Sequence, residues 1–390
     1  MRKILSVLLI LAMIASLAAC GETAGDEGYK IAMVTDYGDI TDQSFNQTTW
    51  EAIVKFGKDH NVPTKYYKPT TNDTAGRVGM VELAIAEGNN IIVLPGFAFG
   101  ETVYEVQDVY PDVKFIALDV SEFDVFDCFY NHDAAGNWTG LIDGNDPPHI
   151  SPNVYCAVYR EELSGYMAGY AAVKLGYTKL GFLGGMKVSA VQRFGHGYVQ
   201  GADAAARELG IHVEMKYVYG GQFYGDADIT AVMDTWYATG TEVVFACGGD
   251  IYDSVAEAAR KVGGKIIGVD TDQSAVIDGK YGDGITLTSA MKSLYPTTID
   301  TLTDVIIHGN WADYAGKVAT LGLVSGDDVS RNYVRIPTDT TQFAEGRFTE
   351  ADYEDLVKAM FEGAVTVSSD TSAIPATTNT RVDDQGSIKG

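Results

Sequence analysis

The sequence predicts an α/β protein of two doubly wound lobes, each built on a parallel sheet, joined by a hinge that the chain crosses more than once. Three observations support this prediction. The chain of 390 residues is too long for one ordinary domain. Short apolar runs alternate with amphipathic segments along most of its length. The alternation stops at residues 123–152 and then restarts in the same form.

The N-terminus has the features of a targeting segment rather than of folded structure. Two basic residues precede an apolar run, residues 4–16, that is too short for a comfortable membrane span. Small residues then stand directly before Cys20, as in a bacterial lipobox. We expect residues 1–19 to be a lipoprotein signal peptide, Cys20 to be acylated, and residues 20–28 to form an acidic tether on the extracytoplasmic face of the cell membrane. The alternative is an ordinary signal peptide with an incidental cysteine.

The first lobe is predicted over residues 29–153 and again over about 289–316. An apolar strand at 31–34 ends in a loop that carries three carboxylates, two aromatic rings and an amide. Further strands are predicted at 65–67, 91–94 and 114–119, and helices at 47–60, at 74–88 and from 101 onward. The strand at 91–94 is continuously apolar, as expected when helices cover both faces of a parallel sheet. Residues 123–152 have no periodicity and are predicted to form a long surface loop.

The second lobe is predicted over residues 154–288 and about 317–367. Its strands are predicted at 154–158, 180–183, 213–218, 242–247, 265–269 and 285–288, and its helices at 161–175, 193–209, 226–237 and 252–262. The elements that follow are a helix at 296–308, a strand at 318–324, a helix at 349–361 and a short strand at 365–367. They are too few for a third domain, so we expect them to cross to the first lobe and return, which makes a hinge. The polar tail, residues 368–390, is predicted to be disordered or loosely packed.

Charge and motifs exclude several classes of function. A net charge of −25 argues against binding nucleic acid or anionic lipid by charge. No hydrolase, metalloprotease or P-loop motif is present, and no CxxC pair supports a metal site, so we expect neither enzyme activity nor a cofactor or metal ion. Asp270 and Asp272 could serve in acid–base chemistry, but no histidine lies near them in the sequence. The sequence leaves open a disulfide of Cys128.

Polar or glycine-rich residues follow several predicted strands, which favours a binding site. These strand ends carry Asp36, Asp119, Gly184–Gly185, Gly248–Asp250 and Asp270–Asp272. Each is also explained by helix capping or a tight turn, but ligands bind beyond the carboxyl ends of strands in such sheets. Phe45 offers a flat apolar face, or alternatively packs in a helix core. Lys292 can donate to ligand hydroxyls, or alternatively is a solvated surface lysine. Together they predict a receptor for a small, flat, polar ligand.

Residues 36–47 carry the pattern D-x-G followed by D-Q-S-F-N-Q, which resembles the signature of the basic membrane protein family. These are substrate-binding lipoproteins of ABC transporters, similar to purine nucleoside receptors. Further matching motifs lie at residues 152–154, 159–172, 193–201, 268–273 and 288–292, so the resemblance covers about residues 30–365. It implies a type I periplasmic-binding-protein fold that binds a nucleoside, a purine nucleoside by preference, between the lobes and delivers it to an ABC transporter permease.

The resemblance also implies which residues contact the ligand. Phe45 is expected to stack on one face of the base, and Phe194 or Tyr198, with Phe223 as a looser match, on the other. The polar contacts are expected from Asp36, Asn46 and Asp119 at the base edge or ribose, and from Asp270 and Lys292 at the ribose hydroxyls. The strand-end argument adds Gly248, where the backbone can approach the ligand closely.

The chain departs from the family pattern at residues 123–152, an insertion, and at Tyr198, where a phenylalanine is expected. Two other functions stay open: a sugar or signal-molecule receptor of the same fold, and a nucleoside-processing enzyme. We expect a monomer whose partners are the nucleoside, the permease and, through lipidated Cys20, the membrane. The sequence does not fix the base that is preferred.

Overall fold

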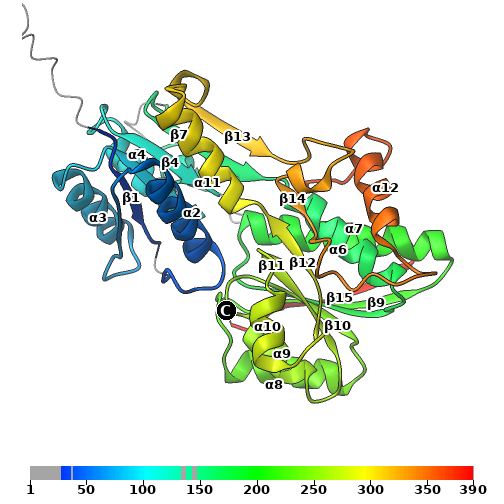
Figure 1. The fold of residues 1–390 in the computed structure, drawn as a ribbon. Helices are drawn as coiled ribbons and strands as arrows, with labels where there is room; N and C mark the ends of the chain where they lie inside the picture. The colour runs from blue at the N-terminus through cyan, green and yellow to red at the C-terminus, as the bar shows by residue number, and fades with distance from the viewer. Residues whose placement is uncertain (1–27, 37, 133–137, 143–146, 390) are drawn as a thin grey trace, which may run out of the picture.

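Two sheets, one in each lobe, organise the chain, and hinge segments connect them (Figure 1). The computed structural model describes residues 28–36, 38–132, 138–142 and 147–389. The predicted signal peptide and the predicted acylation site, Cys20, therefore lie outside the described residues. The α/β class, the parallel sheets and the two lobes are confirmed.

The first sheet has the strand order β13-β7-β4-β3-β1-β2, and its strands are all parallel. These strands are β1 (Ile31–Val34), β2 (Thr64–Tyr67), β3 (Ile91–Pro95), β4 (Lys114–Leu118), β7 (Val154–Tyr159) and β13 (Lys317–Leu321). The helices around it are α2 (Phe45–His60), α3 (Thr74–Ala86), α4 (Gly100–Gln107) and α11 (Leu294–Leu302). The residues of β1 alternate between two cores: Ile31 and Met33 pack with α2 and α11, whereas Ala32 and Val34 pack with α3 and α4. Helices on both faces explain why this strand is continuously apolar.

The second sheet has the order β14-β12-β11-β10-β8-β9-β15 and is parallel except for the pair β12 and β14. Its strands are β8 (Lys179–Gly184), β9 (Val213–Tyr219), β10 (Val243–Cys247), β11 (Lys265–Asp270), β12 (Thr286–Lys292), β14 (Val334–Arg335) and β15 (Thr380–Ser387). Its helices are α6 (Glu161–Lys174), α7 (Ser189–Leu209), α8 (Ala227–Ala238), α9 (Tyr252–Ala259), α10 (Ser274–Tyr281) and α12 (Glu350–Phe361).

Helices α6 and α7 lie unusually close together beside the cleft. A Cβ at Gly197 would lie only 2.1 Å from the carbonyl oxygen of Glu162, so a glycine is required there. The contact brings the first turns of both helices to the same end of the sheet. It thereby places Glu161 beside Arg193 and Phe194.

The chain crosses between the sheets after Tyr159, after Lys292 and after Leu321. The crossing segments are hydrogen-bonded to one another: Arg160 N–H donates to the Leu321 carbonyl at 2.9 Å, and Ser293 N–H to the Tyr333 carbonyl at 2.8 Å. This is the hinge architecture that the sequence predicts, and in Figure 1 α11 leads from β12 back to the first lobe.

The sheet assignment of three strands differs from the expected one. We expected residues 154–158 and 318–324 in the second lobe, but β7 pairs with β4, and β13 with β7, in the first sheet. We also expected the first lobe to resume at about residue 289, but β12 stays paired with β11 as far as Met291. An apolar run predicts a strand without indicating which of two sheets accepts it.

Two segments predicted to lack regular structure contain it. Within residues 123–152, the short helix α5 (Glu122–Phe126) is followed by the hairpin of β5 (Tyr130–His132) and β6 (Trp138–Leu141). Three aromatic rings stabilise this hairpin, because Trp138 stacks on Tyr130 at 4.3 Å and on Phe123 at 5.2 Å between centroids.

The polar tail is also ordered, which corrects the prediction of disorder. Strand β15 pairs with β9, and the carboxylate of Asp203 accepts the N–H groups of Thr378, Asn379 and Thr380. A composition rich in Ser, Thr and Asp did not reveal a strand, because an edge strand needs few apolar side chains. The short strand predicted at 365–367 is absent from the described residues, which are irregular there.

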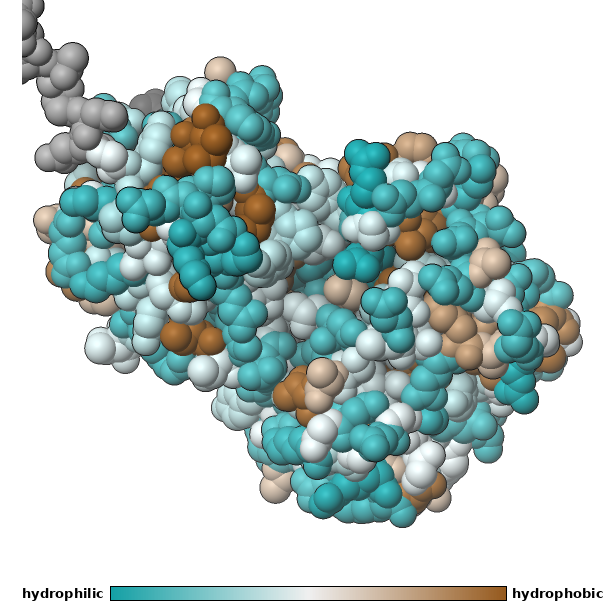
Figure 2. Space-filling view, viewed as in Figure 1, coloured by the Kyte–Doolittle hydropathy of each residue, from teal (hydrophilic) through white to brown (hydrophobic). Residues whose placement is uncertain are grey.

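The surface of both lobes is largely hydrophilic in the view of Figure 2, with apolar residues in small separate groups. Within the described part of the chain, no helix combines the length and apolarity that crossing a membrane requires. Cys128, Cys156 and Cys247 are free thiols, Cys128 exposed and the other two buried.

Candidate functional site

A cavity of about 410 Å³ lies between the lobes at the carboxyl ends of the strands. Its volume falls within the range of small-molecule sites, roughly 300–1,000 Å³. The first lobe contributes residues that follow β1, β3 and β4, and the second contributes residues of α7 and residues at the ends of β10, β11 and β12. The predicted site residues that line this cavity are Asp36, Phe45, Asn46, Asp119, Phe194, Phe223, Gly248, Asp270 and Lys292.

Tyr198 does not line the cavity, and the structure corrects its predicted place there. The side chain is fully buried in the second lobe, with ring centroids 5.4 Å from Phe245 and 6.5 Å from Phe182. Phe194 and Tyr198 share one face of α7, but only the first turns of this helix reach the cleft. One turn further on, the same face covers the sheet.

The loop before α2 is held in place by its own carboxylates. Asp42 accepts the N–H groups of Ser44, Asn46 and Gln47, so it caps the N-terminus of the helix. The Asn46 amide donates to Asp36 at 3.1 Å and to Asp42 at 2.9 Å. Phe45, the first residue of α2, is thereby fixed in the cavity wall.

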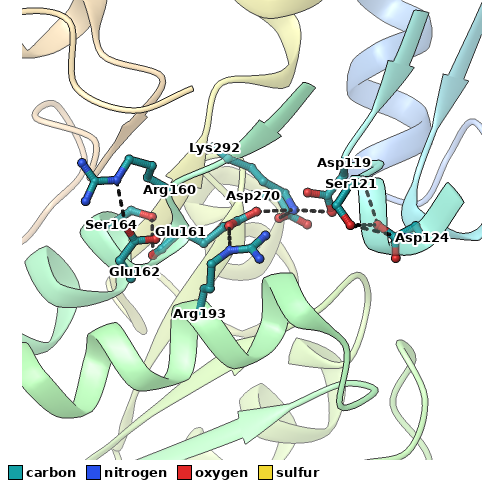
Figure 3. A network of polar contacts seen from close by, with 10 residues as sticks. All are labelled: Asp119, Ser121, Asp124, Arg160, Glu161, Glu162, Ser164, Arg193, Asp270 and Lys292. Carbon is teal, nitrogen blue, oxygen red and sulfur yellow. Dashed lines mark hydrogen bonds and ion pairs between the residues drawn. The ribbon is translucent and has the colours of Figure 1, made fainter. Parts of the chain in front are cut away.

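A buried ammonium group joins the lobes at the end of the cavity near the hinge (Figure 3). Lys292, the last residue of β12, is 4% exposed. Its Nζ lies 3.0 Å from Asp119 Oδ2, 3.5 Å from Asp270 Oδ1 and 3.7 Å from Glu161 Oε1. Burial by itself lowers the pKa of Lys292, but the three carboxylates outweigh it and hold the pKa above its ordinary value. The lysine is therefore a fixed cation.

The carboxylates of this cluster are aimed by strained backbone. Asp119 and Asp270 have φ angles of 62° and 65°, a left-handed conformation that costs non-glycine residues about 1–3 kcal/mol. Burial raises the pKa of Asp270, and the nearby Lys292 and a hydrogen bond from Ser44 Oγ at 2.7 Å oppose that rise. Because Ser44 belongs to the first lobe and Asp270 to the second, this bond also connects the lobes.

Aromatic rings from both lobes border the cavity. The Lys292 ammonium lies 4.6 Å from the ring centroid of Phe45 and 5.6 Å from that of Phe194. The ring centroid of Phe223 lies 6.5 Å from that of Phe97, which belongs to the first lobe. Gly248 provides room for the Phe223 ring, because a Cβ there would lie 2.6 Å from its Cδ1 atom.

Sequence reasoning missed several residues at this site. Glu161 is fully buried and accepts from Arg193 Nε at 2.6 Å, but the two are 32 residues apart and their spacing gives no local signal. Phe97 and Asp250 also line the cavity. Phe97 lies just beyond the end of β3, where the strand-end argument could have found it, whereas Asp250 belongs to a strand end that this argument had already named. Among the described residues, no cluster of three or more His, Cys, Asp or Glu side chains could hold a metal ion.

Comparison with known proteins identifies the family. The profile of the Bmp family, described as ABC transporter substrate-binding protein PnrA-like, matches residues 29–366. The chain belongs to this family. Its members bind the solute of an ABC transporter, and at this level the sequence resemblance is confirmed.

Relatives and solved structures agree with this assignment. The ABC transporter nucleoside-binding protein BmpA of Lactococcus lactis subsp. cremoris is 26% identical over 338 residues, which cover 81% of this chain and 87% of that protein. Basic membrane protein B of Borreliella burgdorferi is 27% identical over 314 residues, covering 78% and 82%. A solved ABC transporter system solute-binding protein from Aeropyrum pernix K1 superimposes with a TM-score of 0.62 at 19% identity, covering 87% of each chain, which supports the fold.

Proposed function

We propose that this Bmp-family protein captures a nucleoside in the cavity between its lobes and delivers it to an ABC transporter permease. The observation that carries the proposal is the combination of aromatic rings from both lobes with a buried cluster of charges at one end of the same cavity. A nucleoside has the matching parts, a planar base and a ribose with vicinal hydroxyls.

The rings suit the base. Phe45 from the first lobe, and Phe194 and Phe223 from the second, can stack on a planar heterocycle when the lobes close. Stacking of this kind contributes on the order of 1–3 kcal/mol per base. A receptor for a free pentose does not need rings on both sides of its ligand, so the rings favour a nucleoside over a free sugar.

The charge cluster suits the ribose. The carboxylates of Asp119 and Asp270 can accept hydrogen bonds from ribose hydroxyls, and the Lys292 ammonium between them can donate one. Asp119 Oδ1 is buried and has no donor among the described residues, so a ligand without the hydroxyls would leave this acceptor unsatisfied.

The charge of the cavity favours a nucleoside over a nucleotide. Among its described lining residues, Lys292 is the sole basic side chain. The acidic side chains that line it are Asp36, Asp39, Asp42, Asp119, Asp250 and Asp270. A phosphate group would face several carboxylates, and like charges placed together cost several kcal/mol.

In the proposed cycle, the ligand enters the open cleft, the base stacks, the lobes close about the hinge, and the closed form docks on the permease. We also propose that acylated Cys20 anchors the protein on the extracytoplasmic face of the membrane. One relative, from Pyrococcus horikoshii, is described as a lipoprotein. Mass spectrometry of the mature N-terminus tests the anchor: a Cys20→Ser variant should be neither acylated nor membrane-bound.

Isothermal titration with nucleosides, the corresponding nucleotides, free bases and pentoses tests the ligand class. We expect nucleosides to bind and nucleotides and pentoses to bind far more weakly. Phe45→Ala should weaken nucleoside binding by roughly 5- to 150-fold, which corresponds to the loss of one stacking contact. Phe123→Ala, at a ring that is 47% exposed and outside the cavity lining, is the matched control. Equal affinity for ribose and nucleoside, or a Phe45→Ala variant that binds normally, would instead indicate a sugar receptor.

A further inference from the structure

The cavity presents hydrogen-bond acceptors that no group of the described protein satisfies. Asn46 Oδ1, Asp119 Oδ1 and Asp250 Oδ1 are buried and have no donor. The orientation of the Asn46 amide is settled by chemistry: its nitrogen donates to two carboxylates, and a flipped amide would set its oxygen against them. Its oxygen must therefore remain an acceptor. Leaving such groups unpaired costs about 1–3 kcal/mol each, so a fitting ligand supplies donors.

Asp250 stands beside the rings that would hold the base. Its backbone N–H donates to the carbonyl of Phe223 at 2.9 Å, and it lies two residues after Gly248, against which the Phe223 ring is seated. Because Asp250 and Phe223 both line the cavity, a base stacked on that ring would have one edge near Asp250. Across the cleft, the loop before α2 presents Asn46 Oδ1 to the same cavity.

We propose that Asp250 determines base specificity, and that the protein prefers nucleosides whose base carries two adjacent N–H donors, as the 2-amino-6-oxo edge of guanine does. This inference rests on the proposed function. A carboxylate offers two parallel acceptors, which match the N1–H and 2-amino groups of guanosine. Inosine offers only one of these donors, and adenosine has an acceptor at N1 that would face a carboxylate oxygen.

The surroundings of Asp250 raise the pKa of its carboxyl group, so its protonation state depends on the pH and on the bound ligand. Burial first, and then the carboxylates of Asp42 across the cleft and Asp253 on α9, raise the pKa of Asp250 to about 6, against the opposing effect of Lys280 on α10. N–H donors of a ligand favour the ionised form. The guanosine affinity should therefore be nearly complete about one unit above the pKa and fall as the pH drops through about 6, because protons then compete with the base.

Titration calorimetry with guanosine, inosine and adenosine tests the proposal on the wild type and two variants. We expect the wild type to bind guanosine roughly tenfold or more tightly than inosine or adenosine. In Asp250→Asn, the ratio of guanosine affinity to adenosine affinity should fall by about ten- to hundredfold. The variant gains relative affinity for adenosine because an amide pairs with the donor and acceptor of the adenine edge. Asp253→Asn removes a neighbouring carboxylate that is held by Lys280 and Tyr281 outside the cavity lining, and it should keep the wild-type ranking.

The possible results separate this inference from the function on which it rests. If nucleosides bind but guanosine is not preferred, or if Asp250→Asn weakens all three ligands by the same factor, the role of Asp250 is refuted and the nucleoside receptor stands. If the wild type binds no nucleoside, the proposed function fails, and this inference fails with it.

Discussion

Replacing Lys292 by methionine should be among the most destabilising single changes in this protein. The substitution keeps the volume of the side chain but removes the cation shared by Asp119, Asp270 and Glu161, at 3.0, 3.5 and 3.7 Å. At an effective dielectric constant of about 20, Coulomb attraction at such distances is about 5 kcal/mol per pair. Much of that attraction offsets the cost of burying the charges. The expected net loss in the free energy of unfolding is about 3–5 kcal/mol, as for other buried ion pairs that lose one partner.

The loss should depend on pH in a defined direction. Burial already raises the pKa of Asp270, and that of Glu161 to about 7, in the wild type; removing the ammonium, which lowers both, raises them further above the values of the unfolded chain. A group with a raised folded-state pKa stabilises the fold below its unfolded pKa, and that stability is lost as the pH rises through the folded value. The variant should therefore be closest to the wild type in acid and most deficient above pH 7.

Urea unfolding followed by circular dichroism, at pH 5 and pH 8 and without ligand, measures this effect. Lys358→Met is the matched control, because the Lys358 side chain is 50% exposed and pairs with Asp327 on the surface. The control should lose less than about 1 kcal/mol. Equal losses for the two variants, or a loss for Lys292→Met that does not change with pH, would refute the view that a buried cation holds the carboxylates together.

Tyr198→Phe should leave ligand affinity unchanged and stability equal or higher, because the hydroxyl that it removes is buried and has no hydrogen-bond partner in the described part of the chain. Calorimetry showing weaker binding would contradict its place in the core. Ser44→Ala should weaken ligand binding by roughly tenfold, since Ser44 Oγ donates to the Asp270 side chain across the cleft. Small-angle scattering should show the ligand-free variant more open, and an unchanged radius of gyration with normal affinity would argue against this link. Deleting residues 368–390 should lower the melting temperature, because β9 becomes an edge strand and Asp203 loses three N–H donors; a deletion variant as stable as the full chain would mean that β15 contributes nothing.

Local sequence patterns predicted much of the fold and many of the residues that line the cavity. The continuous burial of β1 and β3 follows from apolar runs, and the strand-end argument led to Asp36, Asp119 and Asp270. Prediction from local patterns failed where contacts between distant segments of the chain decide the structure. Tyr198 has the same helical face and the same chemistry as Phe194, and only the position of the cleft along α7 separates a cavity residue from a core residue.

The sequence by itself determined the alternation of strands and helices, the family, and the chemical types of side chain that gather beyond the strands. Apolar periodicity and short motifs are properties of neighbouring residues, so the sequence states them directly. The tertiary structure alone decided which sheet takes β7, β13 and β15, and that Glu161, Arg193 and Lys292 meet in one buried cluster. Those outcomes depend on how segments far apart along the chain pack together, and the spacing of residues in a sequence does not encode that packing locally.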